Sequence, residues 1–203
     1  MRLTSTEAGF VDATPAKPNT LNDFILIQSD LADAVNLIEA FWQRYKADPR
    51  MAKRIMGCIH ALFLAQYPQN LSYERFIYLY TALDACFAMI RSQHPKAPAP
   101  PNHATRVEWM CAQFAMNVPS WASANNKASE VSLVRNDTIH EALFFGEPLG
   151  FAIYGGNQTS RATNVELEME ALLCRLIVGI LGRPGTDYVK SSVTTRQRHG
   201  LTL

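Results

Sequence analysis

The stretch LSYERFIYLYTALDACFAMIRS, residues 71–92, carries a clear helical pattern. Its apolar side chains recur three or four positions apart and form one stripe, which consists of Phe76, Tyr80, Leu83, Phe87 and Ile90. Because an α-helix turns once in about 3.6 residues, side chains with this spacing lie on one face. The stretch therefore predicts an amphipathic α-helix.

Stretches with the same helical character lie on both sides of this one, and proline, glycine or capping residues bound them. Between them, the proline-rich residues 94–103 predict an extended connector, and GEPLGFAIYGGN at 146–157 predicts a loop or short hairpin. No alternation of strands and helices is present. The pattern predicts an all-α bundle of about six helices, with the loop or hairpin before the last long helix. The five further helices are expected at residues 30–47, 50–66, 104–117, 126–145 and 160–181.

The chain divides by composition into three parts. Residues 1–22 are a polar lead-in, residues 23–182 hold the helical bundle, and residues 183–203 form a basic tail that we expect to be solvated. A length of 203 residues is sufficient for one domain with a substantial core.

The overall composition favours a cytoplasmic protein without a membrane partner. Apolar residues make up 48% of the chain and the formal net charge is only +1, so no strong global field indicates a partner. The longest apolar stretch, residues 171–181, contains Arg175 and is too short to span a bilayer. The four cysteines form no CxxC pair and are predicted to be reduced core thiols, with His60 as a core histidine.

Signatures of metal and cofactor sites are missing from the sequence. The five histidines show no metal-ligand spacing, and nothing matches HExxH or GxSxG. The glycines of GILGRPGT at 179–186 lack the lysine that a phosphate-binding loop needs. We therefore expect neither a metal nor a cofactor.

The helix expected at 126–145 carries a charge inside an apolar face. At about 100° per residue, Val131, Val134 and Ile139 share one broad face and Arg135 projects near its middle. A guanidinium in such a place needs a partner or solvent, because a buried unpaired charge is costly. Asp84, on the flank of the stripe in 71–92, is a candidate for the partnering carboxylate.

A second, narrower apolar strip runs along the opposite side of the same helix. His140 lies in it between Leu133 and Phe144, and Asn136 precedes His140 by one turn, close enough for contact. Two apolar faces predict that the helix packs inward on one side and against a partner on the other.

The run Arg135-Asn136-x-x-x-His140 resembles the RNxxxH signature of the HEPN family, in particular the bacterial Apea-like members. The helix that contains Asp84 also resembles an acidic-residue helix that precedes the motif in some bacterial members. The resemblance covers residues 30–182. It implies a helical bundle that commonly forms a homodimer and acts as a metal-independent endoribonuclease on RNA.

Carried over to this sequence, the resemblance implies that Arg135, Asn136 and His140 form the catalytic site, with Asp84 in support. Histidine can act as acid or base near neutral pH, and arginine suits a phosphate. The resemblance also implies a toxin or defence effector that an antitoxin or regulatory protein restrains. Some members carry a modified tyrosine two positions after the histidine, where this chain has Ala142. We do not extend that form of regulation to this protein.

Two other readings stay open from the residues alone. The chain can be a non-catalytic helical dimer that binds a nucleotide or a protein. Alternatively, Arg135 and Asp84 can form a purely structural ion pair in an unrelated bundle.

Overall fold

The computed structural model describes residues 28–98, 102–124, 129–141 and 165–194. Within these ranges every regular element is helical, which confirms the predicted all-α class. No helix of these ranges is long and apolar enough to cross a membrane. The elements are α3 (Gln28–Tyr45), α4 (Pro49–Ala65), α5 (Ser72–Gln93), η2 (His103–Thr105), α6 (Arg106–Gln113), η3 (Ser120–Ala122), α7 (Glu130–His140), α8 (Val165–Leu181) and α9 (Asp187–Lys190).

The first three predicted helices match α3, α4 and α5 to within two residues at each end. The helix predicted over 104–117 is shorter, because the chain leaves the helix after Gln113. Ala115 adopts a left-handed φ of 52°, and the Met116 amide donates to the Cys111 carbonyl at 2.9 Å. This is the Schellman arrangement, in which the left-handed residue is usually glycine. An alanine in that place gave no sequence signal for the helix end.

The helix predicted over 126–145 is shorter in the structure, because α7 begins after its N-cap Ser129 and ends before its C-cap Glu141. The loop or hairpin predicted at 146–157 lies outside the described residues. The last long helix is described from Val165 to Leu181.

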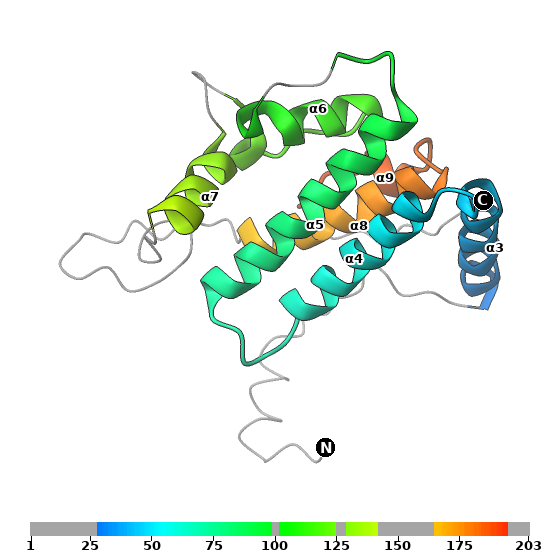
Figure 1. The fold of residues 1–203 in the computed structure, drawn as a ribbon, viewed down its shortest axis with the longest axis horizontal. Coiled ribbons are helices and arrows are strands. Elements are labelled where there is room, and N and C mark those ends of the chain that lie inside the picture. The colour runs from blue at the N-terminus through cyan, green and yellow to red at the C-terminus, as the bar shows by residue number, and fades with distance from the viewer. Residues whose placement is uncertain (1–27, 99–101, 125–128, 142–164, 195–203) are drawn as a thin grey trace.

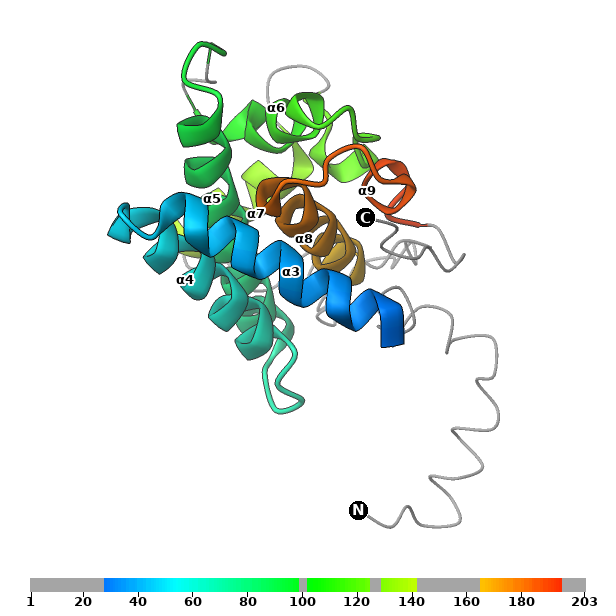
Figure 2. The ribbon, with the colours of Figure 1, turned by 90° about the vertical axis from the view of Figure 1, so that its right-hand side faces the viewer.

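Helix α5 occupies the centre of the bundle. It contacts α4, α6, α7 and α8, and Figure 1 shows α4 and α5 side by side with α8 behind them. In Figure 2, α3 crosses over α4 and α8. The predicted stripe of α5 is buried, and so are Leu79, Ala82 and Met89 outside it. Burial of each large apolar side chain contributes about 1.5–3 kcal/mol, so α5 contributes a large share of core stability.

The thiols lie largely where the sequence places them. Cys58, Cys86 and Cys111 are buried, Cys174 is half-buried, and all four are free. The Sγ atoms of Cys58 on α4 and Cys86 on α5 lie 3.5 Å apart, which reflects the close packing of these helices. His60 is exposed on α4, so its prediction as a core residue is wrong. It lies one turn beyond Met56, on the outward face of this amphipathic helix.

The described part of the predicted basic tail is packed at a few apolar residues, whereas its cations Arg183 and Lys190 are exposed as predicted. Tyr188 and Val189 of α9 are buried, and so is Val193. The reason is Arg175, which is fully buried in α8. Its guanidinium donates to the Ser191 carbonyl at 3.2 Å and lies 4.7 Å from the centre of the Tyr188 ring. The predicted division of the chain at residues 22 and 182 stays a prediction.

Two glycines give a matched test of the packing of α8 against Phe114. A Cβ on Gly179 of α8 would lie 2.7 Å from the Phe114 ring, whereas a Cβ on Gly57 of α4 would meet nothing within 4 Å. We expect Gly179→Ala to lower the free energy of unfolding by about 1–3 kcal/mol through overpacking. Gly57→Ala should raise it by about 0.5–1 kcal/mol through helix propensity. Urea unfolding followed by circular dichroism measures both, and equal effects would contradict the contact between α8 and Phe114.

Candidate functional site

Helix α7 turns one face to the core, which matches the predicted face at Val131 and Val134 but not at Ile139. Val131, Val134 and Thr138 are buried, whereas Ile139 is 48% exposed. The buried side is therefore rotated away from Ile139 and includes a polar residue, Thr138. The second strip faces outward where it is described, since Leu133 and His140 are exposed. Phe144 lies outside the described residues.

The three motif residues come together at the C-terminal end of α7. The Nη1 atom of Arg135 lies 3.0 Å from Oδ1 of Asn136 and 2.5 Å from Nε2 of His140. Arginine only donates, so Oδ1 of Asn136 and Nε2 of His140 both accept from it. Arg135 is half-buried, while Asn136 and His140 are exposed. The arrangement presents a cation and an imidazole to solvent at one place.

Arg135 has no carboxylate partner within the described ranges. Its Nε atom is buried and makes no hydrogen bond there, and no ion pair links it to an acidic side chain. Among the described residues, the dipoles of Asn136 and His140 compensate its charge. An arginine in this state is suited to receive an anion with its fork of donors.

Asp84 does not pair with Arg135. Its Oδ1 accepts a hydrogen bond from Nη1 of Arg106 at 2.8 Å, and the guanidinium of Arg106 lies 4.6 Å from the centre of the Phe87 ring. The purely structural Arg135–Asp84 pair is therefore wrong. The sequence could not show this, because α6 approaches α5 only after the proline-rich connector has turned the chain back.

A second histidine, missed by the sequence analysis, joins this region. Nδ1 of His103 lies 2.7 Å from the hydroxyl of Tyr80 and 3.8 Å from Oδ1 of Asp84. Tyr80 and Asp84 are four residues apart on α5, so they share one side of that helix. The four-residue spacing of Tyr80 and Asp84 was the signal for this cluster that the sequence contained. Nothing in the sequence indicated that His103 would contact these two residues.

The electrostatics link His103 to the motif. The pKa of His103 is lowered below the ordinary value of 6.5, first by burial and then by the charge of Arg106. The charge of Asp84 acts in the opposite direction and raises this pKa. Arg135 and His140 lower the pKa of His103 further. Burial, followed by the charge of Asp84, raises the pKa of Tyr80, so its hydroxyl keeps its proton. The residues around His103 and the motif residues of α7 therefore lie close enough for their charges to interact.

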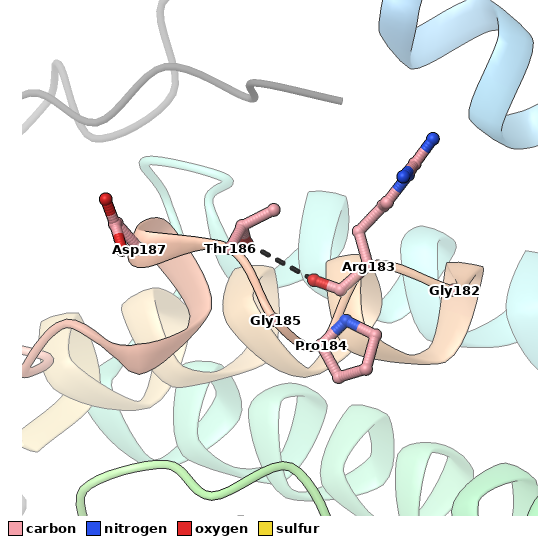
Figure 3. A pocket seen from close by; sticks show the side chains of 6 residues that line it. All are labelled: Gly182, Arg183, Pro184, Gly185, Thr186 and Asp187. Carbon is pink, nitrogen blue, oxygen red and sulfur yellow. Dashed lines mark hydrogen bonds between the residues drawn. The ribbon is translucent and has the colours of Figure 1, made fainter.

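A separate hollow lies in the turn that follows α8. It measures about 380 Å³ and is lined by Gly182, Arg183, Pro184, Gly185, Thr186 and Asp187. Figure 3 shows the Thr186 hydroxyl donating to the Arg183 carbonyl, at 3.2 Å. Thr186 thereby closes the turn before α9, and the charged side chains of Arg183 and Asp187 lie at opposite ends of the turn (Figure 3). This open hollow has the geometry of a turn and not of a phosphate loop.

No group of three or more histidine, cysteine or acidic side chains in the described ranges is arranged to hold a metal ion. No family model, curated protein or solved structure matches this chain. Our functional interpretation therefore depends on the site itself and on the motif resemblance.

The depressed pKa of His103 makes stability depend on pH. The unfolded chain takes up a proton at this histidine near its ordinary pKa of about 6.5, whereas the folded protein does so only at lower pH. We expect the free energy of unfolding to fall as pH decreases below about 6.5, and His103→Asn to reduce this fall. Urea unfolding at a series of pH values measures it. The control is His60→Asn on α4, and the same reduction there would contradict a specific effect of His103.

Proposed function

We propose that the protein is a metal-independent endoribonuclease with Arg135, Asn136 and His140 at its catalytic site. The observation that carries the proposal is the contact of the Arg135 guanidinium with both other residues, at an accessible position without a carboxylate partner in the described ranges. A phosphodiester supplies the negative charge that Arg135 lacks, and RNA supplies both phosphate and nucleophile.

The proposed reaction uses the 2′-hydroxyl of RNA as nucleophile. The 2′-oxygen loses its proton and bonds to phosphorus, the bond from phosphorus to the 5′-oxygen breaks, and that oxygen gains a proton. The products are a 2′,3′-cyclic phosphate and a 5′-hydroxyl. Arg135 stabilises the charge on the phosphorane, and Asn136 holds a phosphate oxygen or the imidazole. Once the phosphate draws Arg135 away, Nε2 of His140 is free to carry a proton.

We expect the purified protein to cleave single-stranded RNA in the presence of EDTA. His140→Ala should reduce cleavage by about 10²–10⁴-fold, because it removes a proton-transfer group. Arg135→Lys should also reduce it, because lysine lacks the planar fork of donors. Cleavage is followed on labelled oligonucleotides by gel electrophoresis, and mass spectrometry identifies the cyclic phosphate.

The matched control for these variants is His60→Ala, which removes an exposed histidine from α4 and should keep the wild-type rate. A folded His140→Ala protein that still cleaves RNA at the wild-type rate would refute the assignment. Metal-dependent cleavage that EDTA abolishes would refute the proposed mechanism.

A homodimer through the outward strip of α7 is part of the same proposal. Leu133 is 52% exposed and shares this side of α7 with His140, so a two-fold contact would bring two sites together. We expect sedimentation velocity to show a dimer that Leu133→Glu dissociates. Val35→Glu, on the exposed side of α3, is the control and should leave the dimer intact. A wild-type monomer at all concentrations, or dissociation by Val35→Glu alone, would contradict this interface.

The cellular role that we propose, a toxin or defence effector held in check by an antitoxin or another regulatory protein, depends on the family resemblance alone. The second candidate function is a non-catalytic dimer that binds a nucleotide or a protein. The exposed Val35, Ile38 and Trp42 on α3 favour it, because apolar side chains at helical spacing on a surface commonly mark a protein contact. The RNase assay separates the two candidate functions, because the non-catalytic dimer requires that no preparation cleaves RNA.

A further inference from the structure

The element that carries His103 is attached directly to the helix that carries the motif. His103 begins η2, and the backbone amide of Ser129, immediately before α7, donates to the Ala104 carbonyl at 3.3 Å. On its other side, η2 continues into α6. This backbone hydrogen bond holds η2 against the N-terminal end of α7, the end opposite to His140.

The imidazole of His103 is held at one nitrogen and free at the other. Nδ1 faces the Tyr80 hydroxyl at 2.7 Å and the Asp84 carboxylate at 3.8 Å. Nε2 makes no hydrogen bond with the described part of the chain, and 26% of the side chain is exposed. An imidazole with an oriented Nδ1 and an accessible Nε2 is the arrangement in which histidine accepts or delivers a proton.

We propose that His103 is the general base of the ribonuclease site and that His140 of the same chain is its general acid. This inference rests on the proposed function. It assigns a role to Tyr80 and Asp84 as positioning residues, which orient the imidazole of His103 without contact with RNA.

The proton balance follows from these roles. Nε2 of His103 takes the proton of the 2′-hydroxyl as the 2′-oxygen bonds to phosphorus. His140, protonated, gives its proton to the 5′-oxygen as the bond from phosphorus to that oxygen breaks. The imidazolium that forms on His103 donates from Nδ1 to Tyr80 and lies beside the negative charge of Asp84. Exchange of protons with water returns both histidines to their starting states.

The charges around His103 suit a base. Before reaction the imidazole must be neutral, and burial first, then the groups that face it from three elements, keep it so on balance. Only Asp84 among them favours the charged form, and it becomes useful when the proton arrives. The groups are Tyr80 and Asp84 from α5, Arg106 from α6, and Arg135 and His140 from α7.

Both proton-transfer groups then come from one protomer. A dimer across α7 is still compatible with this arrangement, but it is no longer needed to supply a second histidine. The site has its base on η2, its acid and phosphate ligand on α7, and its positioning residues on α5.

The test compares two leaving groups on one RNA. The first substrate is an oligonucleotide that the wild-type protein cleaves at a mapped site, and the second carries sulfur in place of the 5′-oxygen at that site. Sulfur leaves without protonation, so it removes the need for the acid but not for the base. We expect His140→Ala to lose about 100-fold or more on the oxygen substrate and to recover on the sulfur substrate. His103→Asn, which keeps an amide near the position of Nδ1, should lose about as much on both.

Each contrary result has its own meaning. Wild-type rates with His103→Asn overturn the base role alone, and so does recovery of this variant on the sulfur substrate. A folded wild-type protein that cleaves neither RNA overturns the proposed function, and with it the base role. Thermal melting of each variant, with His60→Asn as the matched control, separates loss of activity from loss of fold.

A pH profile of the wild-type protein tests the base role even where His103→Asn fails to fold. The rate on the sulfur substrate should fall on the acidic side with a pKa below about 6.5, because a protonated His103 cannot act as base. Asp84→Asn removes the one charge that favours protonation, so this acidic limb should move to lower pH. A limb that stays in place, or that moves to higher pH, overturns the assignment.

Discussion

Burial of α5 on several sides at once is the constraint on which the rest of the structure depends. A helix that contacts α4, α6, α7 and α8 has little room for polar side chains, and each one that it carries there needs a partner. Tyr80 is buried and meets this requirement through His103, while Asp84, whose side chain is 42% exposed, pairs with Arg106. These contacts join η2 and α6 to the central helix, which α7 also contacts. The candidate site lies at that junction.

Three arginines show how partnering separates structural from functional candidates. Arg175 is fully buried and donates to carbonyls of residues 171, 191 and 192, so it holds the C-terminal segment on α8. Arg106 is paired with Asp84 and covers the Phe87 ring. Arg135 makes hydrogen bonds with Asn136 and His140, which are both exposed, and pairs with no carboxylate in the described part of the chain. A guanidinium keeps its charge at all ordinary pH values. Arg135 has the weakest partners of the three, so it is the best placed to receive an anion.

Much of the fold was predictable because helix periodicity and helix-ending residues are local properties. The stripe on α5 and prolines near the ends of α4 placed those helices within two residues. The end of α6 was mispredicted because Ala115 occupies the left-handed cap position where glycine is usual. Other errors arose where a distant contact decides burial. Arg175 holds the buried residues Tyr188 and Val189 of the basic segment against α8, and the inward face of α7 is rotated away from Ile139.

By itself, the sequence determined the helical class, the position of the central helix, and the motif Arg135-Asn136-x-x-x-His140, since all of these depend on spacing within one element. Only the tertiary structure decided which charges meet. Asp84 pairs with Arg106 and not with Arg135, and His103 lies beside Tyr80, within reach of the charges of Arg135 and His140. These contacts join α5, η2, α6 and α7, which a proline-rich connector and other loops separate in the chain. Their geometry follows from how the helices pack around α5, and no periodicity within one helix encodes it.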